Sequence, residues 1–302
     1  MNHTRRVIAL GFFDGVHLGH ASLLRKVQQR SRELGATATV LSFDIHPSTL
    51  ITGRSVPLLN SPEDRVWLLR EHWGMEEVLL AHFDETMMHQ PWEDFIRRTL
   101  ARELGAVHVV AGHDYRFGDR GAGDAEKLQK KCAELGIGCD IVGMVELDGQ
   151  QIHSTLIRGL LKEGRCEEAA RYLGHPHLLS GQVRRGKGLG HTLGFPTVNL
   201  RFPKGVLVPA HGVYAARVWT RERCALAAAN IGVRPTVERA GAVNLEAFLL
   251  DCHEDLYGEK LRVELFHRIR GEKKFPDVEA LTAEVLRNAE QVRRYFAALS
   301  AV

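Results

Sequence analysis

The sequence predicts an α/β protein made of two domains. In the N-terminal half, short apolar segments alternate with amphipathic helices, and this alternation predicts a parallel sheet with covering helices. In the C-terminal half, short β-type segments are separated by glycine and proline, which indicates an antiparallel barrel or sandwich. A length of 302 residues is also comfortable for two domains. We place the boundary after Gly174 and expect domains of residues 1–174 and 175–302.

The first half opens with an apolar strand over residues 7–10, a glycine-rich turn, and a helix over residues 23–34 that Gly35 ends. The expected elements that follow are a strand at Thr37–Phe43, a loop at 44–47, helices at 61–73 and 91–104, and strands at 78–80 and 107–111. Ligands of such parallel sheets bind at the carboxyl ends of the strands. Loops that follow the strands are therefore the first places to look for a site.

The chain continues with a helix that begins near Ser154 and reaches Glu163, and with a short helix at Cys166–Leu173. Beyond them, strands are expected at residues 182–184, Gly212–Trp219, 226–231, 245–250 and 261–266. The last expected element is an amphipathic helix at residues 277–299. Its apolar face consists of Leu281, Val285, Ala289, Val292 and Phe296.

Composition excludes several classes of protein. Charged residues at 25% and hydrophobic residues at 44% are ordinary for a soluble globular chain, and a net charge of +3 is too small to indicate nucleic-acid binding. Five cysteines without a C-x-x-C pair indicate reduced thiols. The N-terminus lacks a secretory signal, and no apolar run has the length of a membrane helix. We therefore expect a cytoplasmic protein that binds neither nucleic acid nor membrane, and a homo-oligomer stays open.

Residues 10–20 join the first strand to the first helix and carry the strongest local signal. Glycines, including Gly11, let the backbone approach a ligand, and a helix N-terminus favours an anion. His17 and His20 are three residues apart, so both can face one phosphate. We take these histidines as catalytic candidates, and Gly11, Phe12 and Asp14 as substrate-binding candidates. A tight turn with two surface histidines is the plainer alternative for each residue alone.

Two further loops are expected at the same edge of the sheet. Residues 112–121 carry Asp114 and Arg116. Residues 152–158 carry Ser154 and Thr155, whose hydroxyls suit phosphate oxygens, and Arg158, whose guanidinium can fork onto a phosphate. Taken singly, Ser154 and Thr155 are an ordinary helix cap and Arg158 is a surface arginine. Together they are further candidates for substrate binding.

The second half contains its own glycine-rich segment at residues 186–200. It matches neither the P-loop nor the G-x-G-x-x-G pattern, yet its glycines allow backbone to wrap a polyphosphate. Thr197 and Asn199 would share a face on a strand, and their neutral oxygens suit a Mg²⁺ that already holds phosphates. An ordinary turn is the alternative. Lys187, Gly194 and Pro196 complete the candidate binding residues.

The motifs together resemble those of the bacterial bifunctional riboflavin kinase/FAD synthetases, over about residues 7–299. Residues 11–20 resemble their G-x-F-D-G-x-H-x-G-H signature, and the next two loops resemble G-x-D-F-x-F-G and I-S-S-T-x-I-R. Residues 186–199 resemble the riboflavin kinase motif G-x-x-x-G-R-x-L-G-F-P-T-A-N. Segments at 212–215, 230–236, 255–258 and 270–275 match in the same order. This resemblance implies a Rossmann-like nucleotidyltransferase domain followed by a β-barrel kinase domain with a terminal helix.

The resemblance also implies the chemistry. The C-terminal half would phosphorylate riboflavin to FMN, and the N-terminal half would transfer AMP from a second ATP to FMN, giving FAD and pyrophosphate. ATP is then the co-substrate of both steps, and Mg²⁺ the metal. Glu246 matches the family's general base, a role that suits a carboxylate, and Arg270 falls in a matching segment and is taken as substrate-binding.

The sequence departs from the family pattern at Ile45, His153, His191, Val198, Phe248 and Asn288. His191 replaces an arginine, a stronger anion ligand, so we expect a changed affinity for ATP. Two alternatives stay open. One degenerate site would leave a single-activity enzyme, and a non-enzymatic regulator that binds flavin or nucleotide could use the same folds.

Overall fold

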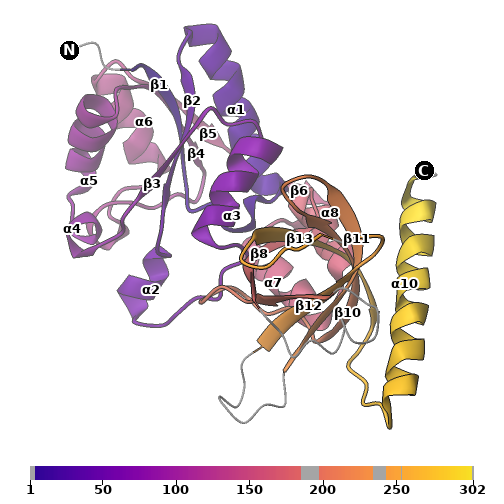
Figure 1. Cartoon of the computed structure of the whole chain (residues 1–302). Coiled ribbons are helices and arrows are strands. Elements are labelled where there is room, and N and C mark those ends of the chain that lie inside the picture. The colour runs from indigo at the N-terminus through magenta and orange to yellow at the C-terminus, as the bar shows by residue number, and fades with distance from the viewer. Residues whose placement is uncertain (1–3, 185–196, 234–242, 253, 301–302) are drawn as a thin grey trace. The chain divides into compact units, whose positions relative to one another are not determined.

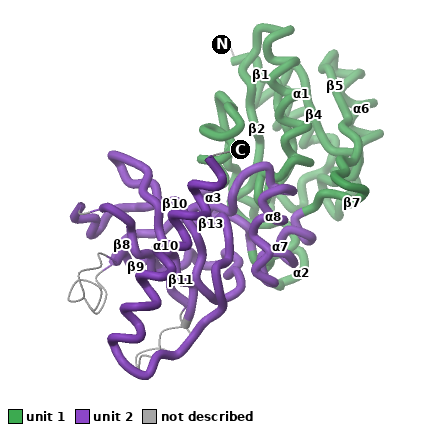
Figure 2. Tube along the Cα trace, turned by 90° about the vertical axis from the view of Figure 1, so that its right-hand side faces the viewer, with its two compact units in different colours: residues 1–57, 65–153 green, residues 58–64, 154–302 purple. Residues whose placement is uncertain are grey.

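The computed structural model describes residues 4–184, 197–233, 243–252 and 254–300. The chain forms two compact units, one of residues 1–57 and 65–153 and the other of residues 58–64 and 154–302 (Figure 2). Two helices that we expected in the first domain, Ser154–Glu163 and Cys166–Leu173, therefore belong to the second compact unit. The functional boundary after Gly174 stays a prediction.

A five-stranded parallel sheet in the order β3-β2-β1-β4-β5 is the centre of the first unit (Figure 1). The strands are β1 (Arg6–Leu10), β2 (Thr37–Phe43), β3 (Glu77–Ala81), β4 (Ala106–Gly112) and β5 (Gly138–Val142). This confirms the parallel sheet and four predicted strands, and it adds β5. The chain leaves β1 toward β2 on one side and later returns to β4 on the other. The carboxyl ends of β1 and β4 therefore form the switch point at which such sheets bind ligands.

Helices cover this sheet. Those before β4 are α1 (Leu18–Leu34), α2 (Pro47–Thr52), α3 (Pro62–Trp67), which continues as a π-helical stretch at Leu68–His72, α4 (Glu85–Met88), and α5 (Trp92–Asp94), which continues at Phe95–Glu103. After β4 come a short turn at Asp119–Gly121, α6 (Ala125–Glu134) and the two-stranded ribbon of β6 (Glu146–Leu147) and β7 (Gln150–Gln151). The helices expected at 61–73 and 91–104 are confirmed. The expected loop at 44–47 instead leads directly into α2, because Pro47 occupies its first turn.

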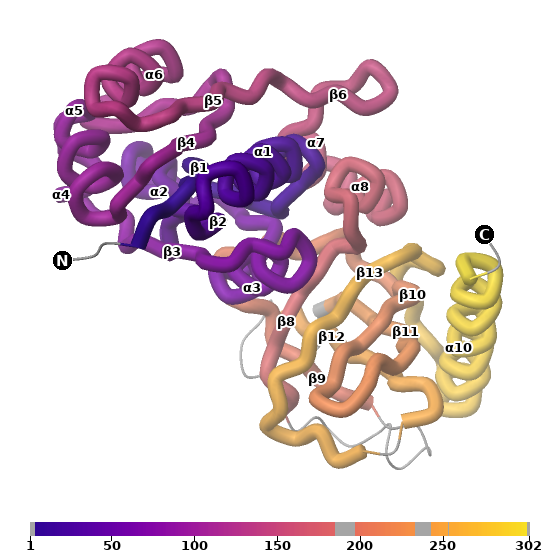
Figure 3. The backbone as a smooth tube through the Cα atoms, turned by 90° about the horizontal axis from the view of Figure 1, so that it is seen from above, coloured from indigo at the N-terminus to yellow at the C-terminus, as the bar shows by residue number. Residues whose placement is uncertain are grey.

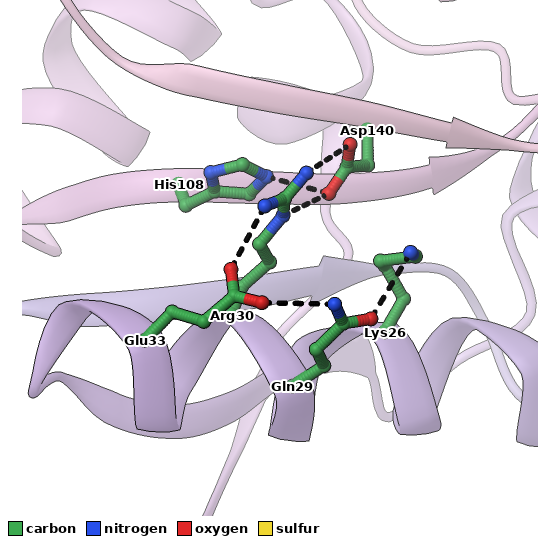
Figure 4. Close-up of polar contacts among 6 residues, drawn as sticks. All are labelled: Lys26, Gln29, Arg30, Glu33, His108 and Asp140. Atoms are coloured by element: carbon green, nitrogen blue, oxygen red, sulfur yellow. Dashed lines mark hydrogen bonds and ion pairs between the residues drawn. The ribbon is translucent and has the colours of Figure 1, made fainter.

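A polar network ties α1 to two strands (Figure 4). Arg30 of α1 donates to both carboxylate oxygens of Asp140 on β5, at 2.7 and 3.1 Å. Asp140 also pairs with Nε2 of His108 on β4 at 2.9 Å. Hydrogen bonds from Arg30, and then from His108, hold the pKa of the Asp140 carboxyl below its usual value. The helix whose first turn carries both candidate histidines is thereby anchored to β4 and β5.

The second unit is a closed antiparallel barrel with strand order β10-β11-β12-β9-β8-β13 (Figure 3). Its strands are β8 (His177–Arg184), β9 (Thr197–Arg201), β10 (Gly212–Trp219), β11 (Cys224–Val233), β12 (Val243–Leu249) and β13 (Lys260–Arg270). Because the six strands close on themselves, this unit is a barrel and not a sandwich, the two architectures that the sequence left open. Several strands exceed their predicted lengths, because pairing with neighbours extends them beyond their apolar centres.

Alternate residues of each strand fill the barrel, and helices complete its core. Leu245, Ala247 and Leu249 of β12 point inward and share a cluster with Ile157 of α7 (Ser154–Glu163) and Leu173 of α8 (Cys166–Leu173). The last helix, α10 (Val278–Ser300), packs on the outside. Its Ala289, Val292 and Phe296 cover outward residues of β10 and β11, which confirms these three positions of the predicted apolar face.

One buried histidine makes the stability of the second unit depend on pH. His177 of β8 is buried and donates through Nε2 to the carbonyl of Leu59, at 2.9 Å. Burial lowers the pKa of His177 to about 4. Unfolding returns the pKa of His177 to about 6.5, so the unfolded chain takes up a proton between pH 6.5 and 4 that the folded chain does not. The contribution of neutral His177 to the free energy of unfolding is therefore fully present above pH 6.5 and is lost as pH falls toward 4. We expect a loss of about 3 kcal/mol from this group over that interval.

The comparison is between wild type and His177→Gln, which keeps a donor for Leu59 but cannot titrate. Thermal melting of the full chain at a series of pH values should show the variant gaining on wild type as pH falls below 6.5. A difference between the two proteins that does not change with pH would contradict the assignment.

Candidate active sites

The turn after β1 holds several residues in unusual backbone conformations. Phe13 has φ 59°, Gly15 has φ 80° and Val16 has φ 41°, all in the left-handed region. Such values are costly for a phenylalanine and most of all for a β-branched valine, so the surroundings must hold the turn in place. Space is tight at Gly11, because a Cβ there would lie 3.0 Å from the ring of Phe13, which would have to shift. Strain of this kind concentrates at functional sites.

His17 and His20 lie together at the start of α1, as the spacing predicts. His17 caps the helix, and its Nδ1 accepts the backbone N–H of His20 at 3.3 Å. The two rings stack with centroids 3.6 Å apart. Because Nδ1 of His17 is an acceptor, the neutral ring carries its proton on Nε2.

His20 is held neutral by its environment. Burial lowers its pKa well below the usual value, and electrostatic interactions with His17 and Arg65, which disfavour a second positive charge here, lower it further. Its Nδ1 is buried and has no hydrogen-bond partner among the residues that the structure describes. A bound polyphosphate would offer this ring both an acceptor and a compensating negative charge.

The sequence analysis missed Arg65, a residue of α3 that lies under this turn. Its side chain is fully buried, donates to the carbonyl of Phe12 at 3.0 Å and also donates to the carbonyl of Phe43. Asp14, only 3% exposed, supplies one of the negative charges that act on it. Helical spacing was the available signal, because Arg65 precedes the buried Leu68 by three positions.

The loop after β4 lies beside the turn after β1. The register pairs Leu10 of β1 with Ala111 of β4, so the two loops leave neighbouring strand ends. Phe117 anchors the second loop in the core, whereas Asp114 and Arg116 are exposed. Arg116 lies 3.6 Å from Asp124, an ion pair at the surface. The structure thus brings Asp114 and Arg116 to the predicted edge and leaves them accessible.

Gly118, at the end of this loop, packs directly against α5. Its φ is 74°, and a Cβ there would lie 2.6 Å from the Cα of Trp92. Gly118→Ala should therefore lower stability by about 3 kcal/mol, combining overpacking with left-handed strain. Gly136→Ala is the matched control, because Gly136 has φ 69° with nothing near its Cβ position. Urea unfolding should show a clearly smaller loss for Gly136→Ala, and equal losses would contradict the role of the close contact.

The third predicted loop spans the point where the two units divide. Ile152, in the first unit, places its carbonyl 3.5 Å from a Cβ position on Gly19, in the first turn of α1. Ser154 and Thr155 are the first two residues of α7, and Arg158 follows one turn later. Thr155 is exposed, and Ser154 and Arg158 are half-buried.

In the barrel, strand register assembles the second candidate site. Asn199 of β9 lies opposite Glu246 of β12, which in turn lies opposite Asn230 of β11. Directly opposed residues share a face, and their inward neighbours Val198 and Ala247 belong to the core. The three polar side chains therefore form a row on the outer face of the barrel. Asn230 was predicted only as part of a matching segment, and the register shows that it completes this row.

Thr197 lies on the same face of β9 as Asn199, as predicted for a strand. It is opposite Phe248, one of the departures from the family pattern. Lys187, Gly194 and Pro196, with the departure at His191, lie outside the residues that the structure describes.

Arg270, at the end of β13, is held by α10. Its Nε donates to Asn288 at 3.1 Å and lies 3.3 Å from Glu284. Burial opposes ionisation of Glu284, but Arg287 and Lys273 still bring the pKa of its carboxyl below the usual value. Glu284 thus supplies a negative charge beside Arg270, whereas Asn288 supplies a neutral acceptor.

Comparisons with known proteins match both halves of the chain. A family model described as FAD synthetase matches residues 1–156, and one described as riboflavin kinase matches residues 173–296. The bifunctional riboflavin kinase/FMN adenylyltransferase of Listeria monocytogenes is 34% identical over 97% of this chain and 93% of its own length. The chain belongs to the bifunctional riboflavin kinase/FMN adenylyltransferase family.

Other members of the family are similarly close. The Escherichia coli K12 riboflavin kinase/FMN adenylyltransferase is 35% identical over 96% of this chain and 92% of its own length. A crystal structure described as a macrolide-efflux protein from Streptococcus pneumoniae has 29% identity and a TM-score of 0.82, covering 96% of this chain and 94% of that one. In the present chain, no helix of the described residues combines the length and apolar character needed to span a membrane.

Proposed function

We propose that this chain converts riboflavin to FAD in two ATP-dependent reactions, one in each predicted domain. The C-terminal domain phosphorylates riboflavin to FMN, and the N-terminal domain transfers AMP from ATP to FMN with release of pyrophosphate. The observation that carries the proposal is the presence of both sets of polar groups in one chain: the stacked His17 and His20, and Glu246 in register with Asn199. Membership of the bifunctional family supports the same conclusion.

In the kinase reaction, Glu246 is the proposed general base. Its carboxylate accepts the proton of the primary hydroxyl of riboflavin as that hydroxyl attacks the terminal phosphorus of ATP. No cluster of three His, Cys, Asp or Glu residues suited to a metal occurs among the described residues. The neutral oxygens of Thr197 and Asn199 nevertheless fit a Mg²⁺ ion that keeps phosphate and water ligands, and such an ion would neutralise phosphate charge. Arg270, with Lys187, Gly194 and Pro196, is proposed to bind the substrates.

In the adenylyltransferase reaction, catalysis is mainly positioning and charge stabilisation. A phosphate oxygen of FMN attacks the α-phosphorus of ATP, and pyrophosphate leaves without a covalent protein intermediate. His17 and His20 donate to the polyphosphate at the N-terminus of α1. The proposed substrate-binding residues are Gly11, Phe12, Asp14, Asp114, Arg116, Ser154, Thr155 and Arg158.

Time-resolved separation of flavins tests the proposal. The purified chain is incubated with riboflavin, ATP and Mg²⁺, and FMN should appear first, followed by FAD. FMN alone would indicate a single-activity kinase, and FAD formed only from added FMN would indicate a single-activity adenylyltransferase. Quenching of flavin fluorescence without ATP turnover would indicate a binding protein. We also propose that the protein acts in the cytoplasm, a location supported by five cysteines without a C-x-x-C pair.

A further inference from the structure

We propose that Arg65 is a positioning residue of the FAD-forming site: its buried guanidinium fixes the turn after β1 and places a positive charge beneath it. The inference rests on the proposed adenylyl transfer. Arg65 contacts both the carbonyl and the ring of Phe12, a proposed substrate-binding residue.

The guanidinium joins the carboxyl ends of two neighbouring strands. Nη1 donates to the carbonyl of Phe12, just after β1, and Nη2 donates to the carbonyl of Phe43, the last residue of β2. The hydroxyl of Ser42 donates to the same Phe12 carbonyl at 2.8 Å. The Phe12 carbonyl therefore has two donors immediately before the left-handed Phe13, and its orientation is fixed.

The guanidinium also supports the aromatic ring of Phe12. Its Cζ lies 4.0 Å from the centroid of that ring, a close cation–π contact. The ring in turn meets His46 edge-on, with centroids 4.5 Å apart. Arg65 thus fixes both the main chain and the side chain of Phe12, which is how a strained turn keeps one conformation.

The charge of Arg65 is unusual for a purely structural residue. The two acceptors described above are neutral backbone carbonyls, and its Nε has no hydrogen-bond partner among the described residues. Burial lowers the pKa of Arg65 to about 10, opposed by the charges of Asp14 and Asp44, so it stays protonated at neutral pH. An apolar side chain would fill this space without the desolvation cost. In a site that binds the polyphosphate of ATP, the positive charge of Arg65 would attract the negative phosphates.

The test compares Arg65→Met, which removes the charge, with Arg65→Lys, which keeps it. Arg70→Met is the matched control, because Arg70 is exposed and follows Arg65 on the same continuous helix. Steady-state kinetics of FMN adenylylation and riboflavin phosphorylation are measured on each full chain. We expect Arg65→Met to lose about 100-fold in kcat/KM for FAD formation only, Arg65→Lys to recover part of it, and Arg70→Met to match wild type.

An NMR titration of the His20 ring separates positioning from simple packing. The charged groups that act on this ring are His17 and Arg65. Arg65→Met should raise the pKa of His20, and Arg65→Lys should leave it near the wild-type value. Equal losses of activity and of melting temperature in both variants, with no change in this titration, would overturn the proposal. So would full FAD formation by a folded Arg65→Met.

The titration also keeps this inference distinct from the proposed function. If wild type makes no FAD from FMN, the proposed function fails for the N-terminal domain. The role of Arg65 in the electrostatics of the turn is still decided by whether the His20 titration responds to the charge at position 65.

Discussion

Glu246→Gln should abolish riboflavin phosphorylation, with a loss in kcat of about 1,000-fold and a much smaller change in KM. The amide keeps the shape of the carboxylate but cannot accept the proton of the attacking hydroxyl. Glu246 is half-buried on the outer face of β12, with Asn199 and Asn230 on either side. Because both neighbours are uncharged amides, replacing the carboxylate with an amide leaves no opposite charge unpaired on either neighbour, and the variant should fold normally.

The measurement is FMN formation from riboflavin, with FAD formation from added FMN as the internal control. Glu222→Gln, at an exposed position of the same unit, controls for the loss of one negative charge. Retention of most phosphorylation by a folded Glu246→Gln would contradict its role as the base. Loss of both reactions would contradict the assignment of one reaction to each predicted domain.

His20→Ala should have the opposite effect, with a loss of about 100- to 1,000-fold in FAD formation and no change in FMN formation. The ring is stacked on His17, and its buried Nδ1 has no hydrogen-bond partner among the described residues, so its removal takes away a polar group that is available to the polyphosphate. Its side chain makes no helix cap, but its ring packs on His17 and Phe13, so thermal melting is measured beside activity to account for the lost packing. His72→Ala, at an exposed position of the same unit, is the control.

His17→Ala offers a second comparison, because His17 also caps α1. This variant should lose FAD formation and, in addition, about 1 kcal/mol of stability. Chromatography of the flavins and thermal melting distinguish the two effects. If His20→Ala still made FAD at the wild-type rate, the proposed role of the stacked pair would be wrong, whatever the effect of His17→Ala.

The sequence by itself determined most elements and the order of the motifs. Apolar runs such as that of β1 and the cap and proline signals near Ser61 are local, so they predict strands and helices without knowledge of the partner strand. The three-residue spacing of His17 and His20 likewise sets their proximity, because one helical turn brings such residues together.

The tertiary structure decided what depends on contacts distant in sequence. Nothing local predicts that Glu246 faces both Asn199 and Asn230, because register depends on the pairing of three strands. The burial of Arg65 beneath Phe12, 53 positions away, likewise follows from the packing of α3 under the sheet edge. Barrel closure is another such property, because it requires the pairing of all six strands. Local patterns therefore determined which groups are present, and non-local packing decided which of them meet.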